Sequence, residues 1–196
     1  MKQIVLPLLV LSLALAACNG DYLAKPRGYF RIDLPQKGYQ RFEQPGFPFT
    51  FEYPVYGTIV RDTSFFGERT ENPYWLNIDF PDYRGRIHLS YKLIGPNRFD
   101  SLVQDAYELS YKQHTYRASA IDHKPFTTPN GIEGVYVTLR GNTATGNQFF
   151  LTDSVRHFLR GALYFETTPN EDSLRPVAEF FRRDMEHLIN TLRWTR

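Results

Sequence analysis

The 196-residue sequence contains a single cysteine, Cys18, and this scarcity limits the chemistry that the chain can perform. A lone thiol has no partner for an internal disulfide and cannot build the multi-cysteine sites that hold zinc. An excess of one charge is also missing, because 23 basic residues nearly balance 21 acidic ones. Since nucleic-acid binding normally needs a concentrated basic surface, we expect no nucleic-acid partner.

Motifs that carry catalysis are equally scarce. The chain has no H-E-x-x-H motif, no G-x-S-x-G elbow and no glycine-rich phosphate loop. Asp79 and Asp82 could form an acid–base pair, but strand alternation points Asp79 outward and a Pro-Asp turn explains Asp82. We therefore expect no catalytic residues and no metal, while a hydrolase site assembled from distant residues stays open as an alternative. The histidines, which lack metal-ligand spacing, are His88, His114, His123, His157 and His187.

The N-terminus carries a targeting signal. Lys2 precedes an almost wholly apolar run that ends at Ala17 and is shorter than the about 20 residues of a membrane-spanning helix. Residues 1–17 are therefore predicted to be a secretory signal peptide. The sequence Leu15-Ala16-Ala17-Cys18 resembles the lipobox of bacterial lipoproteins, with the first three residues as the signal peptidase recognition site.

The lipobox resemblance implies that Cys18 carries a diacylglycerol on its sulfur and an N-acyl chain, such as palmitate, on its freed amine. Several acyl chains would anchor the protein firmly, since each buried methylene contributes about 0.8 kcal/mol. The alternative is an ordinary signal peptide whose cysteine is incidental. Asn19 is not the aspartate that often retains lipoproteins in the inner membrane, so we expect the outer membrane, with the protein facing the periplasm.

Residues 18–44 are predicted to form a lipidated tether with an edge segment. The part from Lys25 to Pro35 alternates apolar and polar residues like a short strand bounded by prolines. This segment either packs along the edge of its own domain or pairs with the sheet of a partner. In the second case Tyr29, Phe30 and Arg31 are candidate partner contacts.

Residues 45–196 are predicted to form one α+β domain with a mainly antiparallel sheet flanked by helices. Alternation predicts a four-stranded meander followed by a helix, which is capped by Asn97 or Asp100 and ends near Tyr116. A connecting segment, Ser119–Phe126, leads to a second meander, and a long amphipathic helix capped by Asn170, Asp172 or Ser173 closes the chain. The predicted strands are Phe47–Tyr53, Val55–Arg61, Tyr74–Phe80, Arg86–Leu93, Gly134–Gly141, Asn147–Thr152 and Arg156–Glu166. This element order resembles the PsbP/Mog1-like α/β/α sandwich.

Aromatic residues make up 16% of the chain, enough to fill a core and to leave rings for a binding surface. Trp75 and Tyr83 are further candidates for partner contacts, because aromatic residues supply many interface hot spots. The alternative is that these rings are buried in a phenylalanine-rich core.

Several stretches together resemble the gliding motility lipoprotein GldD family of the Bacteroidetes group. They are the lipobox at Cys18, Lys25-Pro26-Arg27-Gly28-Tyr29-Phe30-Arg31-Ile32, Gly161-Ala162-Leu163-Tyr164-Phe165, and Thr168-Pro169-Asn170-Glu171-Asp172-Ser173-Leu174 before a final helix. The resemblance spans nearly the whole chain and brings no catalytic residues with it. It implies a membrane-anchored envelope lipoprotein that serves gliding motility and the linked type IX secretion system as a non-catalytic assembly or scaffold subunit. Its partners would be other envelope proteins of that machinery. The alternative is a periplasmic lipoprotein that binds a small hydrophobic ligand in a pocket between helix and sheet.

Overall fold

The computed structural model describes residues 28, 31–65, 68–112 and 114–195. The chain divides into two units, Met1–Arg31 and Ile32–Arg196, and all elements named here belong to the second unit. Its helices are α2 (Phe99–Tyr111), α3 (Glu171–Thr191) and a short 3-10 helix, η1 (Pro81–Tyr83). Its strands are β1 (Tyr39–Phe42), β2 (Phe49–Pro54), β3 (Thr58–Arg61), β4 (Ser64–Phe65), β5 (Glu68–Arg69), β6 (Leu76–Phe80), β7 (Gly85–Leu93), β8 (Ala118–Thr127), β9 (Glu133–Gly141), β10 (Asn147–Thr152), β11 (His157–Phe165) and β12 (Arg193–Trp194).

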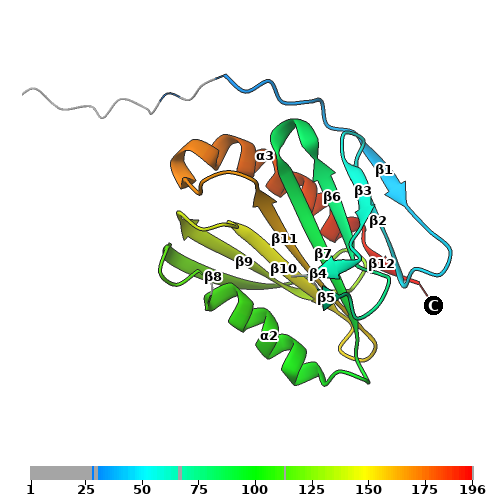
Figure 1. The fold of residues 1–196 in the computed structure, drawn as a ribbon. Coiled ribbons are helices and arrows are strands. Elements are labelled where there is room, and N and C mark those ends of the chain that lie inside the picture. Colours follow the sequence, from blue (N-terminus) through cyan, green and yellow to red (C-terminus); the bar gives the residue numbers. More distant parts are fainter. Residues whose placement is uncertain (1–27, 29–30, 66–67, 113, 196) are drawn as a thin grey trace, which may run out of the picture. The chain divides into compact units, whose positions relative to one another are not determined.

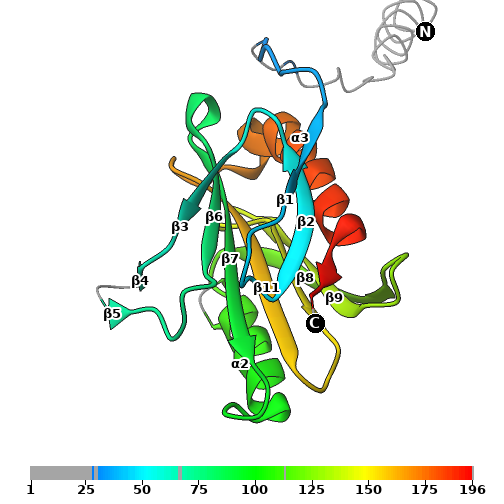
Figure 2. The same cartoon turned by 90° about the vertical axis from the view of Figure 1, so that its right-hand side faces the viewer.

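Two antiparallel sheets and two helices make up the domain. Seven strands form the large sheet in the order β3-β6-β7-β11-β10-β9-β8, and three form the small sheet in the order β1-β2-β12. Helix α2 packs on one face of the large sheet, and α3 packs with the small sheet on the other (Figures 1 and 2). The predicted α+β fold, a mainly antiparallel sheet flanked by helices, is confirmed.

Side-chain alternation along the strands divides the core between the two faces. In β10, Phe149 and Leu151 belong to the cluster under α3, whereas Phe150 belongs to the cluster under α2. All six residues of β10 are buried, because this strand is covered on both faces. In β7 the alternation is complete, since Ile87, Leu89 and Tyr91 are buried while their neighbours are partly exposed.

The first predicted meander is wrong in one respect. The strand expected at Phe47–Tyr53 is β2, which pairs with β1 and β12 in the small sheet and not with β3. Its two phenylalanines, Phe49 and Phe51, are buried in the cluster under α3, where Phe49 lies 5.6 Å from Tyr91 between ring centres. Of the four strands predicted for this meander, β3, β6 and β7 follow one another in the large sheet. The predicted second meander is confirmed, since β9, β10 and β11 pair in sequence order.

The connecting segment predicted at Ser119–Phe126 is also wrong, because these residues lie within β8. This strand pairs along its length with β9 and ends the large sheet. Its sequence, with alanine, aspartate, lysine and proline, has low strand propensity, and its many exposed residues hide the period-two pattern. Pairing with β9 overrides the local preference.

The two helices differ in how their N-termini are capped. Asn170 caps α3 as one of the predicted alternatives, its side-chain oxygen accepting from the Ser173 amide at 3.0 Å. Helix α2 has Arg98 at its N-cap position and no side-chain cap, and it ends at Tyr111. The predicted cap Asn97 donates instead to Glu71 at 2.7 Å and to the Leu93 carbonyl at 3.0 Å. None of the helices in the described ranges combines the length and the apolar character that crossing a membrane requires.

Candidate functional site

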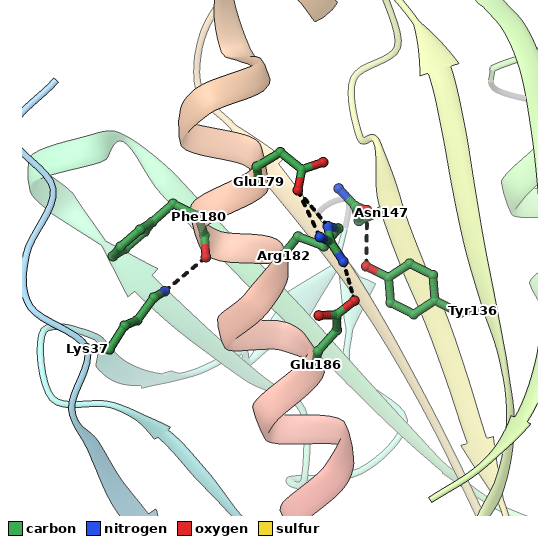
Figure 3. Close-up of polar contacts among 7 residues, drawn as sticks. All are labelled: Lys37, Tyr136, Asn147, Glu179, Phe180, Arg182 and Glu186. Carbon is green, nitrogen blue, oxygen red and sulfur yellow. Dashed lines mark hydrogen bonds and ion pairs between the residues drawn. The ribbon is translucent and has the colours of Figure 1, made fainter. Parts of the chain in front are cut away.

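Helix α3 has two polar flanks, and both lie against segments that come from elsewhere in the chain. On one flank, Lys37 reaches the helix from the segment that precedes β1 (Figure 3). On the other, Arg182 projects between Glu179 and Glu186 on the side where Tyr136 and Asn147 lie (Figure 3). These flanks are named the clamp and the groove.

The clamp is centred on a buried carboxylate. Asp184 has 0% exposure, and its side chain accepts from Lys37 Nζ at 2.6 Å, Tyr56 OH at 2.7 Å and Tyr39 OH at 3.0 Å. Asp184 follows Phe181 by three residues on α3, so the helical period turns it toward the core. A buried carboxylate is costly unless it is paired and hydrogen-bonded, and this one has three donors.

All three donors of the clamp come from the start of the domain. Lys37 precedes β1, Tyr39 opens it, and Tyr56 follows β2. The Lys37 ammonium also donates to the Phe180 carbonyl at 2.9 Å and lies 3.3 Å from the centre of the Phe180 ring. The clamp therefore binds the first strand of the domain to its last helix.

Burial dominates the titration of the clamp. It raises the pKa of Tyr39 to about 12, with Asp184 adding to the effect, and it raises the pKa of Tyr56 further. Burial lowers the pKa of Lys37, while the adjacent Asp184 carboxylate opposes this shift. Both tyrosines therefore keep their protons and act as hydrogen-bond donors at neutral pH.

A second contact holds the segment just before the clamp. Tyr83 in η1 donates from its hydroxyl to the Asp33 carbonyl at 2.9 Å, and its ring lies 5.3 Å from that of Phe181. Within the stretch predicted as tether, the residues from Asp33 to Phe42 thus contact η1, α3 and β2.

The groove lies between α3 and the β8–β10 part of the large sheet and has a volume of about 890 Å³. Its floor includes Tyr136, Thr138 and Asn147, and its helical wall includes Arg182 and Glu186. Apolar side chains such as Phe126 and Ile189 line it as well, so the surface mixes polar and apolar groups.

The charges of the helical wall are paired with one another. Arg182 donates to Glu179 through Nη2 at 2.8 Å and through Nε at 3.0 Å, and it also bonds Glu186. These hydrogen bonds raise the pKa of Arg182. Across the groove, Tyr136 OH donates to Asn147 Oδ1 at 3.0 Å, and burial followed by the nearby Glu186 charge raises the pKa of Tyr136. The groove therefore offers a preorganised hydrogen-bonding surface with little excess charge.

The structure describes only some of the predicted site residues. Cys18, Leu15, Ala16, Ala17, Tyr29 and Phe30 lie outside the described residues, and Arg31 is an exposed residue of the first unit. Trp75 is half-buried and donates from its indole nitrogen to the Tyr91 carbonyl at 2.9 Å. Together with the hydrogen bond from Tyr83 to Asp33, this places both predicted aromatic contacts against the domain's own chain.

The residues considered for chemistry are dispersed. Asp79 is held by Arg86 at 2.5 and 2.7 Å on the face away from α3, while Asp82 is exposed in η1. Within the described ranges, no three His, Cys, Asp or Glu side chains gather closely enough to hold a metal ion. The groove lining, as far as it is described, includes no histidine, cysteine or serine.

The clamp was missed by the sequence analysis. An aspartate between Phe181 and Met185, inside the apolar stripe of α3, is a signal that could have identified Asp184 as a buried charge. Nothing in the sequence marks Lys37, Tyr39 and Tyr56 as its partners, since they are about 130 to 150 residues away and meet it only through the fold.

A family model matches most of the chain. The family model described as "Gliding motility lipoprotein GldD" matches residues 19–194. A search of curated proteins found no match. Among solved structures, the solution structure of cyanobacterial PsbP (CyanoP) from Synechocystis sp. PCC 6803 is 10% identical over 87% of this chain and 98% of that chain, with a TM-score of 0.48.

Proposed function

The chain belongs to the gliding motility lipoprotein GldD family, and on this basis we propose that it is a lipid-anchored assembly subunit of the cell envelope. It serves gliding motility and the linked type IX secretion system through contacts with other envelope proteins. It forms and breaks no bonds of a substrate.

Anchoring follows from Cys18. A diacylglycerol on the sulfur and an N-acyl chain such as palmitate on the amine hold the mature N-terminus in a bilayer, because two or more chains together give stable anchoring. We place this bilayer at the outer membrane, with the domain in the periplasm, since Asn19 follows the cysteine. From Cys18 to Lys37 the extended chain reaches at most about 65 Å, which sets the range of partners.

The clamp is the single observation that supports this role best. An assembly subunit acts by holding its partners in place, so its anchored segment must be firmly attached to the domain that contacts them. Lys37 and Tyr39 bind the Asp184 carboxylate on α3. Tension on the N-terminal segment is therefore transmitted to this helix as well as to the pairing of β1 with β2. The groove on the opposite flank of α3 is then a contact surface of fixed geometry relative to that junction.

Replacing the acylated residue tests the proposal. Cells that carry Cys18→Ala in place of the natural gene should lose the protein from the membrane fraction and should stop gliding, since the anchor is gone. The matched control is Asn19→Gln, which keeps the cysteine and should keep both properties. A Cys18→Ala protein that still sediments with membranes and supports gliding would contradict the proposal.

A second candidate function is the binding of a small hydrophobic ligand, and the groove supports it. A cavity of about 890 Å³ between α3 and the sheet is large enough for a small ligand, and Phe126, Leu163 and Ile189 contribute apolar surface. If this candidate holds, native mass spectrometry of the full chain released gently from envelopes will show a bound lipid-like molecule besides the covalent anchor. The Tyr136→Arg variant, which fills the groove with charge, should lose that molecule.

A further inference from the structure

The free edge of the large sheet has a charge pattern that complements itself. Strand β8 is the last in the order β3-β6-β7-β11-β10-β9-β8, and among the described residues no strand pairs with its outer edge. It runs from Ala118 to Thr127 and lies beyond β9 at the rim of the sheet (Figure 1). A strand of this length offers a row of backbone donors and acceptors to another strand.

Natural edge strands are usually protected by charge, proline or a bulge. Strand β8 has Asp122, Lys124 and Pro125, and its register is irregular between Ala118 and Ala120. These features disfavour non-specific pairing of β8 with the strands of other proteins. The two charges are opposite in sign, however, so they do not prevent pairing with a strand that carries the same pair in reverse order.

Asp122 and Lys124 lie on one face of β8, because residues two apart in a strand share a face, and both line the groove. Both are exposed, and neither forms an ion pair with another described residue. When two antiparallel copies of β8 meet with His123 opposite His123, Asp122 of each copy faces Lys124 of the other. Two symmetric ion pairs result from charges that are unmatched in the single chain.

Neighbouring registers are disfavoured by the same residues. A shift by two residues in either direction places Asp122 opposite its own copy or Lys124 opposite its own copy, and like charges directly opposite each other destabilise a strand pair. The pattern therefore selects one register and one partner strand. Proline in an edge strand normally turns its missing N–H outward. Pro125 then places the N–H groups of Ile121 and His123 on the free edge, where they can donate across the symmetry axis.

The opposite face of β8 also has surface for a second copy to cover. His123 stacks on Tyr111 of α2 at 5.2 Å between ring centres, and Tyr111 is 45% exposed. Burial lowers the pKa of His123, so the two imidazoles that face each other across the axis are neutral and do not repel.

We propose that the protein forms a homodimer through antiparallel pairing of β8 with β8 of a second copy, with Asp122 and Lys124 joined reciprocally across the axis. The two large sheets become one continuous sheet, and the two grooves adjoin on the same side of it. The arrangement is isologous, because each copy contributes the same surface.

Charge reversal at two positions tests the proposal with its own rescue control. The full chain, purified in detergent, is measured by sedimentation equilibrium as wild type, as Asp122→Lys, as Lys124→Asp, and with both changes together. Each single change converts two attractive pairs into two repulsive ones, and we expect self-association to become roughly tenfold weaker. The double variant restores complementarity in the reverse sense and should self-associate like the wild type.

Other outcomes overturn the proposal. A wild type that sediments as one chain throughout the micromolar range would exclude the dimer. A double variant as weak as the single ones would show that the charges do not face each other. As an independent check, His123→Cys should form a disulfide-linked dimer in intact envelopes, whereas Val60→Cys on the opposite edge strand β3 should not. Failure of the Cys18→Ala test would leave these expectations unchanged, because the β8 edge is independent of the anchor.

Discussion

Burial keeps several histidines neutral in the folded protein. It lowers the pKa of His88, with Arg86 adding to the effect, and it lowers the pKa of His114, with Arg160 adding to the effect. The pKa of His157 is lowered by burial as well, although Asp153 opposes the shift. Each of these side chains therefore binds a proton less readily in the folded chain than in the unfolded chain.

Acidification should destabilise the domain in a defined window. A group whose folded pKa is depressed gives its full stabilisation above the unfolded pKa, near 6.5 for histidine, and loses it as the pH falls through the folded pKa. The thermal midpoint of the full chain should therefore decrease when the pH is lowered from about 7.5 to about 5.5. Most carboxylates stay ionised in this range. The double variant His88→Gln and His114→Gln should show a flatter profile. An unchanged wild-type midpoint across this range would contradict the expected effect.

Two predicted helix caps, Asn170 and Asn97, had different outcomes. The role of Asn170 as a cap follows from its place before an acidic first turn, and the structure confirms it. Asn97 is not the cap of α2, because the helix begins at Phe99 with Arg98 in the N-cap position. The Asn97 amide donates to Glu71, which comes from another part of the chain, and a local pattern cannot reveal this partner.

Among the elements, the clamp between the β1 segment and α3 is the contact whose loss should cost most. Replacing Lys37 by Met leaves the buried Asp184 carboxylate without its cation, and we expect the free energy of unfolding to fall by about 1–3 kcal/mol. The measurement is chemical denaturation of the full chain. Arg175→Met is the matched control, since Arg175 forms an exposed ion pair with Asp172 on the same helix and should cost less than about 1 kcal/mol.

A second substitution at Asp184 distinguishes the cost of an unpaired carboxylate from the cost of lost side-chain packing. Adding Asp184→Leu to Lys37→Met removes the stranded carboxylate, so the double variant should lose less stability than the sum of the two single changes. Equal costs for Lys37→Met and Arg175→Met would show that the clamp adds no stability.

Strands and helices differ in how well their sequences predict them. Strand β7 and helix α3 have full apolar periodicity, because each buries one face. The predicted strand starts one residue after β7 does, and the cap of α3 is one of the predicted alternatives. Strand β8 was missed because its stability comes from pairing with β9 and not from its own residues. The sheet to which β2 belongs could not be predicted, since β2 has the same phenylalanine pattern whichever strands flank it.

For the whole molecule, element order was enough to predict an α+β fold with helices on an antiparallel sheet. It allowed a pocket between helix and sheet as an alternative but could not locate the groove, which lies where α3 and the small sheet leave much of β8 and β9 uncovered on one face. Nor could it predict the clamp, which closes the domain between its first strand and its last helix. Both features depend on how layers pack and not on local pattern.

If the protein acts as an acylated envelope subunit, the acyl chains must be present on its mature N-terminus, and the mass of that N-terminus shows whether they are. Protein extracted from membranes and digested should yield an N-terminal peptide that begins at Cys18 and carries the mass of a diacylglycerol and one N-linked acyl chain. An N-terminal peptide that begins at another residue, or one with an unmodified thiol at Cys18, would contradict anchoring by acyl chains.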